Sequence, residues 1–306
     1  MRLVFIATGD IALPAFRHLI ASGNAPMALV TQPDKPVGRH QQMHPPAIKT
    51  VAIDAGIPVL QPKKIGDAAE EIAALDPDVL VVMAYGQILK QDILSLPKKA
   101  IINLHASLLP KYRGAACIQA AIDAGDHESG ITSMHVVREL DAGDIIVAKS
   151  IPIASDETGS SLHDRLADLA IPVLNETLAG LANGTACRTP QDPKLVSHVP
   201  KLDREDGKLD WSQSAEKIER RIRAYDPWPG TYTTVVENGS RKRLKIFPPT
   251  RISKLPLQPG QVTCHDGIFT VGCGDSSLEL TTVQPEGGKR MTVGDYLRGK
   301  KPEKFD

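Results

Sequence analysis

Short apolar runs and segments with helical spacing alternate along the first half of this chain, and this alternation constrains the fold more than any other feature. The apolar runs have the length of buried strands and lie at residues 2–8, 27–32, 79–85, 100–106, 131–137 and 145–153. Residues 13–23 and 45–56 carry apolar side chains at the spacing of one helix face. Strands that alternate with helices build a largely parallel sheet covered on both faces. The sequence therefore predicts an α/β domain with a Rossmann-like, mostly parallel sheet.

A long amphipathic segment at residues 158–184 predicts the helix that ends this domain. Thr158 can cap its first turn, and Gly184 can stop it. We expect the first domain to cover residues 1–185. Residues 186–205 are rich in proline and charge and show no periodicity, which predicts a linker.

A second domain is expected at residues 206–306. It begins with a helical pattern at residues 214–226, and short β-rich runs divided by glycine, proline and asparagine follow. The Asn-Gly pair at residues 238–239 is typical of a two-residue hairpin turn. Several such runs at close intervals predict a small, OB-like β-barrel.

Composition excludes several classes of protein. Of the 306 residues, 42% are hydrophobic and 24% are charged, which is typical of a folded chain with a sizeable core. The longest apolar runs are far shorter than the roughly 20 residues that span a bilayer, so no membrane span is expected. Four cysteines, Cys117, Cys187, Cys264 and Cys273, lack the spacing of metal ligands, and we expect reduced thiols, no metal and a cytoplasmic location.

Charge is balanced over the whole chain but divided unevenly along it. Residues 207–306 carry 17 basic and 12 acidic side chains, a net charge of +5, whereas residues 1–206 carry 19 and 24, a net charge of −5. The neutral total argues against a general polyanion binder. The basic final third is consistent with a phosphate-rich partner there, or with a merely solvated basic surface.

Two polar side chains stand at the end of an apolar strand, where α/β sheets place their sites. Asn103 and His105 are two positions apart, so an extended strand points both to one face and Leu104 to the other. Asp141 lies in an acidic, glycine-containing loop further on. By contrast, the turn at residues 6–16 has one glycine before its helix, so neither NAD nor ATP is expected.

An Asn, His and Asp trio is sufficient for acyl transfer to an amine. Asn103 can donate to the oxyanion of a tetrahedral intermediate without titrating. His105 can transfer a proton or stabilise the oxyanion, and Asp141 can orient His105 or accept the amine proton through water. Taken singly, each residue is as well explained as a turn or core residue.

The motif around these residues resembles the signature of the folate-dependent formyltransferases. That signature reads Asn-x-His-x-Ser-x-Leu-Pro, then Arg-Gly and a helix, with an aspartate in a later Leu-Asp-x-Gly-Asp loop. Here its positions are Asn103, His105, Ser107, Leu109, Pro110, Arg113, Gly114 and Asp141. The resemblance implies 10-formyltetrahydrofolate as the formyl donor.

Three further features resemble the methionyl-tRNA formyltransferase family. They are the proline-rich loop at residues 31–49, the segment at residues 205–233, and the order and length of the whole chain. The resemblance implies transfer of the formyl group to the α-amino group of methionyl initiator tRNA, for translation initiation, by an enzyme that we expect to be a monomer.

The resemblance also implies binding residues. For folate they are Ala84, Tyr85, Gly86, Ile88, Ser107, Leu108, Leu109 and Pro110. For tRNA they are Lys35 and Arg39 in the loop and Arg241, Arg243 and Lys245 on one face of a predicted barrel strand. The sequence departs from the family at Gln41 and Gln42, where many relatives have basic residues, and at Cys117, where proline is common.

Three alternatives remain open at this level. An amino-sugar N-formyltransferase, acting on nucleotide-linked sugars, would use the same Asn, His and Asp but would not need a basic barrel strand. An RNA-binding module without activity would have no use for the intact trio. A hydrolase that releases formate from the folate would have no use for the second domain.

Overall fold

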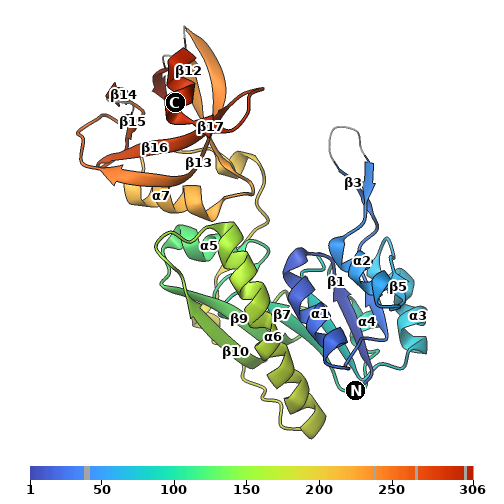
Figure 1. Cartoon of the computed structure of the whole chain (residues 1–306). Coiled ribbons are helices and arrows are strands. Elements are labelled where there is room, and N and C mark those ends of the chain that lie inside the picture. The colour runs from blue at the N-terminus through green and yellow to red at the C-terminus, as the bar shows by residue number, and fades with distance from the viewer. Residues whose placement is uncertain (38–41, 238, 266–267, 300–301, 306) are drawn as a thin grey trace. The chain divides into compact units, whose positions relative to one another are not determined.

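The computed structural model describes residues 1–37, 42–237, 239–265, 268–299 and 302–305 (Figure 1). The chain forms two compact units. The first unit comprises Met1–Gly114, Ser129–Ile151 and His163–Val199. The second unit comprises Ala115–Glu128, Pro152–Leu162 and Pro200–Asp306.

A seven-stranded sheet forms the centre of the first unit, counted over the described residues. Its strands, in spatial order, are β10 (Ile145–Pro152), β9 (Glu128–His135), β7 (Ala100–His105), β6 (Val79–Met83), β1 (Leu3–Ala7), β2 (Ala28–Val30) and β5 (Val59–Leu60). Neighbouring strands from β7 to β5 are parallel, and β9 is antiparallel to β7. The mostly parallel sheet predicted from the alternation of strands and helices is confirmed.

Helices cover both faces of this sheet because its central strands are apolar on both sides. The helices are α1 (Leu13–Ala21), α2 (Ala47–Asp54), α3 (Ala69–Ala74), α4 (Gln91–Leu94) and α6 (Gly159–Asn183), with 3-10 turns η1 (Asp10–Ala12), η2 (Ile65–Ala68) and η3 (Pro193–Leu195). Phe5 of β1 meets Phe16 of α1 with ring centroids 5.2 Å apart. Its neighbours Val4 and Ile6 pack in a separate cluster with Ile72 of α3.

The helix predicted at residues 158–184 is confirmed as α6. Thr158 Oγ1 accepts a hydrogen bond from the Ser161 N–H at 3.1 Å, which satisfies one of the free donors of the first turn. Gly184 has a positive φ of 72°, a conformation that glycine adopts without steric cost, and the helix ends before it.

Two short strand pairs were not foreseen. β3 (Lys35–Val37) pairs with β4 (Gln42–His44) in an antiparallel ribbon within the proline-rich loop. β8 (Arg113–Gly114) pairs with β11 (His198–Val199) in parallel, so a segment with the composition of a linker hydrogen-bonds to the first unit. Isolated strands of two or three residues carry too little pattern to predict.

The second unit is a nearly closed antiparallel barrel with helices. Its sheet runs in the order β14 (Val262–His265), β15 (Ile268–Gly272), β16 (Ser277–Pro285), β13 (Ser240–Ser253), β12 (Thr231–Glu237) and β18 (Pro302–Phe305), and β17 (Met291–Thr292) pairs with β16. The Phe305 N–H donates to the Gly260 carbonyl at 2.8 Å, which brings the two ends of the sheet together. The predicted barrel and the predicted hairpin between β12 and β13 are both confirmed.

Aromatic side chains fill the barrel. Trp211, Phe269 and Phe305 are buried, and the Phe305 ring lies 5.6 Å from Trp211 and 5.4 Å from Phe269. The remaining elements of this unit are α5 (Cys117–Ala124), α7 (Ala215–Ala224), α8 (Val293–Gly299) and η4 (Glu205–Gly207). Within the described residues, no helix combines the length and the apolar character needed to cross a membrane.

Candidate active site

Asn103, His105 and Asp141 lie together at the end of β7. The alternation of the strand buries Leu104 on the opposite face and leaves Asn103 and His105 on one side. The Asn103 amide nitrogen lies 3.5 Å from Asp141 Oδ1, and His105 Nδ1 lies 3.8 Å from Asp141 Oδ2. The structure therefore brings the three predicted catalytic side chains into one cluster.

The hydrogen bond of His105 determines which ring nitrogen carries the proton. His105 Nε2 lies 2.9 Å from the Tyr112 carbonyl oxygen. A carbonyl can only accept, so Nε2 is the protonated nitrogen and donates. Nδ1 is left facing Asp141 across a distance too long for a direct hydrogen bond. The lone pair of Nδ1 is therefore directed to the side of Asp141, where it can accept a hydrogen bond from a water molecule or a proton from a substrate.

Asp141 is held by the backbone around it. Its Oδ2 accepts a hydrogen bond from the Gly114 N–H at 2.9 Å. Its own φ is +49°, in the left-handed region that residues with a side chain rarely adopt. In the same loop, a Cβ added at Gly143 would lie 1.7 Å from the His135 carbonyl oxygen, so only glycine fits there. The acidic loop is therefore shaped to aim a carboxylate and is more than an ordinary turn.

The segment predicted to meet the pterin of folate, residues 84–88, follows β6 directly. Ala84 has a φ of +48° and its carbonyl accepts from the Gly9 N–H at 3.1 Å. The Tyr85 carbonyl accepts from Gln32 Nε2 at 2.6 Å, and Gly86 has a φ of +81°. Ile88 is exposed. The carbonyls of Ala84 and Tyr85 thus each accept a hydrogen bond from within the protein.

Two buried polar side chains next to the site are neutral. Burial raises the pKa of Tyr85 to about 12, and its hydroxyl has no partner among the described residues. Burial lowers the pKa of His135, with Arg188 adding to the effect. Because both groups lack charge near neutral pH, neither of them adds a charge beside the cluster.

The turn at residues 107–110 is stabilised by hydrogen bonds to Lys111 and to Thr132 of β9. The buried Ser107 hydroxyl donates to the Lys111 carbonyl at 2.7 Å. Thr132 Oγ1 donates to the Ser107 carbonyl at 2.7 Å and accepts from the Leu109 N–H at 3.1 Å. The Leu109–Pro110 peptide bond is cis. Leu108 is half-buried and packs near Gly130, where an added Cβ would lie 2.5 Å from Leu108 Cδ2.

The predicted tRNA-binding residues differ in the contacts that their side chains make within the protein. Arg241, Arg243 and Lys245 are exposed on β13, whereas Leu244 and Ile246 of the same strand are buried in the barrel. Arg243 also lies over the Tyr232 ring at 3.9 Å and pairs with Glu205 at 3.4 Å.

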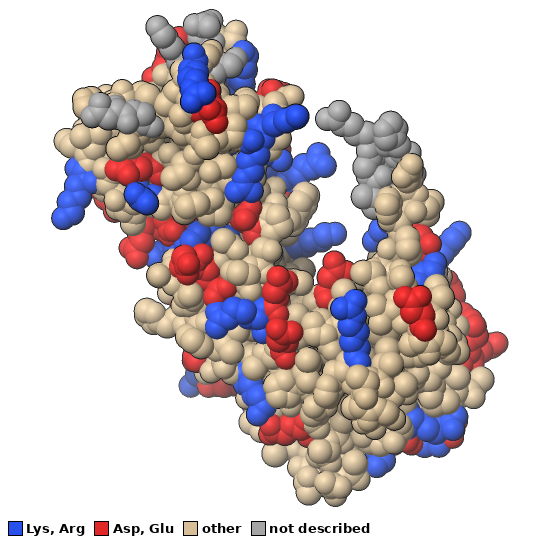
Figure 2. All heavy atoms as spheres, viewed as in Figure 1, with Lys and Arg blue, Asp and Glu red and all other residues tan. Residues whose placement is uncertain are grey.

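In the proline-rich loop, Lys35 is exposed and donates to Gln32 Oε1 at 2.7 Å. Arg39 and Gln41 lie outside the described residues. On the face shown in Figure 2, basic side chains stand among acidic ones. Any nucleic-acid surface on that face must therefore be tested residue by residue.

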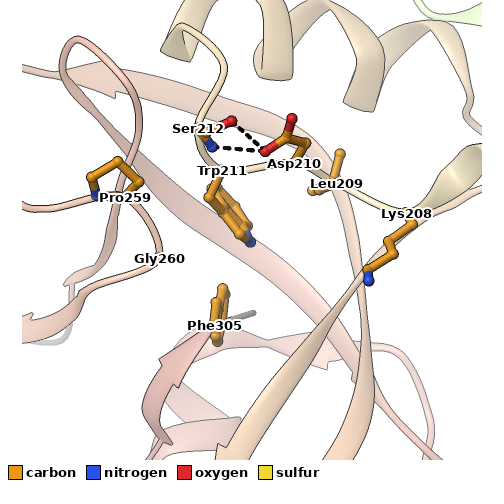
Figure 3. A pocket seen from close by; sticks show the side chains of 8 residues that line it. All are labelled: Lys208, Leu209, Asp210, Trp211, Ser212, Pro259, Gly260 and Phe305. Atoms are coloured by element: carbon orange, nitrogen blue, oxygen red, sulfur yellow. Dashed lines mark hydrogen bonds between the residues drawn. The ribbon is translucent and has the colours of Figure 1, made fainter.

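A hollow of about 410 Å³ lies in the barrel and contains none of the predicted site residues (Figure 3). Trp211 and Phe305 form apolar walls of it. The Asp210 carboxylate beside them accepts from the Ser212 N–H and hydroxyl at 3.0 and 2.6 Å, and from Gln213 Nε2 at 2.9 Å. These local bonds occupy the carboxylate, and the lining of the hollow is mainly apolar, with two aromatic rings.

Two residues that sequence reasoning missed contact the catalytic cluster. Gln191 and Ser197 hydrogen-bond to the loop of Asp141 and to the turn after His105. Their surroundings in the sequence are rich in proline and charge, which predicted a linker. Only tertiary contacts identify them. The described residues contain no group of three His, Cys, Asp or Glu side chains placed to hold a metal ion.

Comparison with known proteins shows the class of this chain. Residues 1–178 match the family described as formyl transferase, and residues 201–301 match the formyl transferase C-terminal domain. Among known structures, the N-formyltransferase from Helicobacter canadensis, in complex with folinic acid and dTDP-3-aminofucose, superposes with a TM-score of 0.69. It is 17% identical, and the match covers 95% of this chain and all of that one. The chain is therefore a formyl transferase, with an N-terminal and a C-terminal domain of that family.

HypX from Aquifex aeolicus, in complex with tetrahydrofolic acid, shares the fold at a TM-score of 0.66 and 18% identity, but this chain spans 47% of its length. Curated relatives are much closer. The methionyl-tRNA formyltransferase of Akkermansia muciniphila is 51% identical over 98% of this chain and 96% of that protein. That of Geobacter metallireducens is 43% identical over the same shares. The chain belongs to the methionyl-tRNA formyltransferase family.

Proposed function

We propose that Asn103, His105 and Asp141 are the catalytic residues of this enzyme. The reaction transfers the formyl group of 10-formyltetrahydrofolate to the α-amino group of methionyl initiator tRNA, for translation initiation. Family membership supports the reaction. The observation that supports these residues is their convergence: the Asn103 amide and His105 Nδ1 lie 3.5 and 3.8 Å from the two oxygens of one carboxylate.

The chemistry divides into attack and departure. The methionine amine attacks the formyl carbon, and the carbonyl oxygen becomes an oxyanion to which the Asn103 amide donates. The amine nitrogen loses a proton to the His105 and Asp141 pair, directly or through water. The C–N bond to the folate then breaks, and the folate nitrogen takes up a proton as it leaves. The products are formylmethionyl-tRNA and tetrahydrofolate.

The donor and acceptor sites are part of the same proposal. Folate is expected to lie against residues 84–88 and 107–110, which flank the carboxyl ends of β6 and β7. The acceptor is expected to contact Lys35 and Arg39 in the loop and the exposed cations of β13. We further propose that the enzyme is a monomer and acts in the cytoplasm; free cysteines are consistent with a reducing compartment.

Replacement of His105 by alanine tests the catalytic assignment. We expect turnover to fall by about 100- to 10,000-fold, because proton transfer and oxyanion stabilisation are both weakened. The affinity for methionyl-tRNA should stay within about threefold. The measurement is transfer of labelled formyl groups to methionyl initiator tRNA, with uncharged tRNA and nucleotide-linked amino sugars as alternative acceptors.

His163→Ala is the control, because His163 is a partly exposed residue of α6 that pairs only with Asp164 among the described contacts. A His105→Ala enzyme that kept wild-type turnover would contradict the assignment. Transfer to a sugar but not to methionyl-tRNA would contradict the choice of acceptor and leave the catalytic trio in place.

A further inference from the structure

We propose that Gln191 and Ser197 are positioning residues for formyl transfer. They lie on residues 191–199, which we call the strap. The strap hydrogen-bonds to the two backbone segments that hold the functional atoms of His105 and Asp141. This inference rests on the catalytic assignment above and adds to it a role for a segment that has the composition of a linker.

Gln191 connects the Asp141 loop to Arg113. Its Nε2 donates to the carbonyls of Asp141 and Gly143, both at 2.8 Å. Its Oε1 accepts from Arg113 Nε at 3.1 Å and from Arg113 Nη2 at 2.9 Å. One side-chain amide thus uses both its donors and its acceptor on groups within a few residues of the cluster. No other residue type carries donors and an acceptor at this length and in this geometry.

Ser197 holds the turn whose Tyr112 carbonyl accepts the hydrogen bond from His105. Its Oγ accepts from the Tyr112 N–H at 2.8 Å, and its carbonyl accepts from the Arg113 N–H at 2.8 Å. The carbonyl of the same Tyr112 accepts from His105 Nε2. The Ser197 carbonyl therefore holds the peptide whose own carbonyl orients the His105 ring, and the Ser197 hydroxyl holds the peptide before it.

Both held positions have backbone conformations that need support. Tyr112 has a φ of +60° and Asp141 a φ of +49°. Residues with a side chain adopt this region only where their surroundings determine it. At Tyr112 the support includes the Ser197 hydroxyl, and at Asp141 it includes the Gln191 amide. The strap thus contacts the backbone at each of two strained residues beside the reacting groups.

The strap can act this way because it is itself fixed to the catalytic turn. His198 and Val199 pair with Arg113 and Gly114 as β11 and β8. An added Cβ at Gly114 would lie 2.1 Å from the Val199 carbonyl oxygen, so the two backbones are in close contact. The Gly114 N–H is the donor to Asp141 Oδ2. A shift of the strap would therefore move the carboxylate and the histidine together.

Among the backbone hydrogen bonds of the described residues, one joins the strap to a predicted folate residue: the Ser197 N–H donates to the Pro110 carbonyl at 3.4 Å. Loss of the strap's side-chain bonds should therefore lower kcat and leave KM for both substrates nearly unchanged. A misplacement of catalytic groups by a fraction of an ångström is enough to reduce turnover by roughly 10- to 100-fold.

The test uses the full-length enzyme with Gln191→Met, Gln191→Glu, Ser197→Ala and Ser197→Thr. Gln191→Met keeps the volume and loses all four bonds, whereas Gln191→Glu keeps the acceptor toward Arg113 and loses both donors. Ser197→Thr keeps the hydroxyl and should restore the activity that Ser197→Ala loses. Gln284→Met is the control, because Gln284 is also half-buried and also donates to a carbonyl, that of Gly288, in the barrel.

Two measurements are needed for each variant: steady-state formyl transfer, which gives kcat and KM for both substrates, and hydrogen exchange of peptides that cover residues 108–116 and 138–146. We expect kcat to fall roughly 10- to 100-fold in Gln191→Met, Gln191→Glu and Ser197→Ala with KM within about threefold. Exchange should rise in both peptides for the Gln191 variants, and neither change should occur in Gln284→Met.

Wild-type kcat in the folded Gln191 and Ser197 variants would overturn the proposal, and so would a loss confined to KM. Faster exchange without a change in kcat would overturn it as well, because the strap would then be structural only. If His105→Ala kept wild-type turnover while the Gln191 variants lost it, the catalytic assignment would fail and the effect of the strap on turnover would stand.

Discussion

Backbone strain in this protein is concentrated at residues next to its chemistry. Of the four described non-glycine residues with positive φ, Tyr112 and Asp141 flank His105, and Ala84 begins the predicted folate segment. Asp76 is the fourth and lies elsewhere. Such positions cost about 1 kcal/mol or more each. They persist where several hydrogen bonds determine the conformation, which is what Gln191, Ser197 and the Gly9 N–H provide.

A carboxylate in the second unit is also held in an unfavourable state. Burial raises the pKa of Asp226, and Arg290 only partly opposes this effect. A carboxyl whose pKa is higher in the folded than in the unfolded chain favours folding when it is protonated, at low pH. That contribution is lost as the pH rises through the folded pKa, so the ionised side chain disfavours folding at neutral pH.

Asp226→Asn should therefore raise the free energy of unfolding at pH 8 and have less effect at pH 4. The amide has no charge to desolvate, and the two forms are alike once Asp226 is protonated. Urea denaturation of both proteins at the two pH values measures the difference. A stabilisation of equal size at both pH values would show that the buried charge is not its cause.

At the scale of elements, helix α7 shows how a polar segment can belong to a core. Its apolar side chains Ile218 and Ile222 are buried in the barrel cluster. Arg223 is also buried, 9% exposed, and its guanidinium donates to both carboxylate oxygens of Glu219 and to the Glu157 carbonyl. Pairing of this kind is what permits a charge at a buried helix position.

Arg223→Met should destabilise the second unit by about 2–4 kcal/mol, because it removes the hydrogen bonds that Arg223 donates to Glu219 and to the Glu157 carbonyl. The control is Arg298→Met, which removes an exposed pair with Asp295 on α8 and should cost less than about 0.5 kcal/mol. Chemical denaturation monitored by tryptophan fluorescence reports on the barrel, which contains Trp211. Similar losses in the two variants would contradict the role given to burial.

At the scale of the whole molecule, charge is distributed between the parts of the chain. The final hundred residues carry a net charge of +5 and the rest a net charge of −5. The exposed cations of β13 are on the basic part, and Arg243 is partly neutralised by Glu205. Binding of a polyanion is therefore expected to depend on particular side chains and on salt rather than on the total charge.

Lys245→Glu should weaken binding of methionyl-tRNA. The slope of log affinity against log salt concentration should fall by about one, the value for one lost phosphate contact. Lys254→Glu is the matched control, because it makes the same change of charge just beyond the other end of the strand and is also exposed. Affinities measured at several salt concentrations, from about 50 to about 200 mM, give both the binding constant and the slope of its salt dependence. Equal losses in both variants would indicate a general charge effect and no defined stripe on β13.

The kinds and order of the main elements could be predicted from the sequence, because hydrophobic periodicity and turn residues are local. Residues 100–106 could be recognised as a strand, and its alternation placed Asn103 and His105 on one face opposite Leu104. The Asn-Gly hairpin and the caps of α6 were predictable for the same reason. Asp141 was a candidate because of its acidic, glycine-containing loop, and the motif that resembles the formyltransferases added the function.

The contacts that hold these residues in place depend on the tertiary structure and could not be predicted from the sequence. The distances from Asp141 to Asn103 and His105, the tautomer of His105, and the contacts of Gln191 and Ser197 all join segments that are far apart in the chain. Residues 186–205 look like a linker because proline and charge disrupt any local period. Their hydrogen bonds go to distant backbone groups, and a local pattern carries no record of such partners.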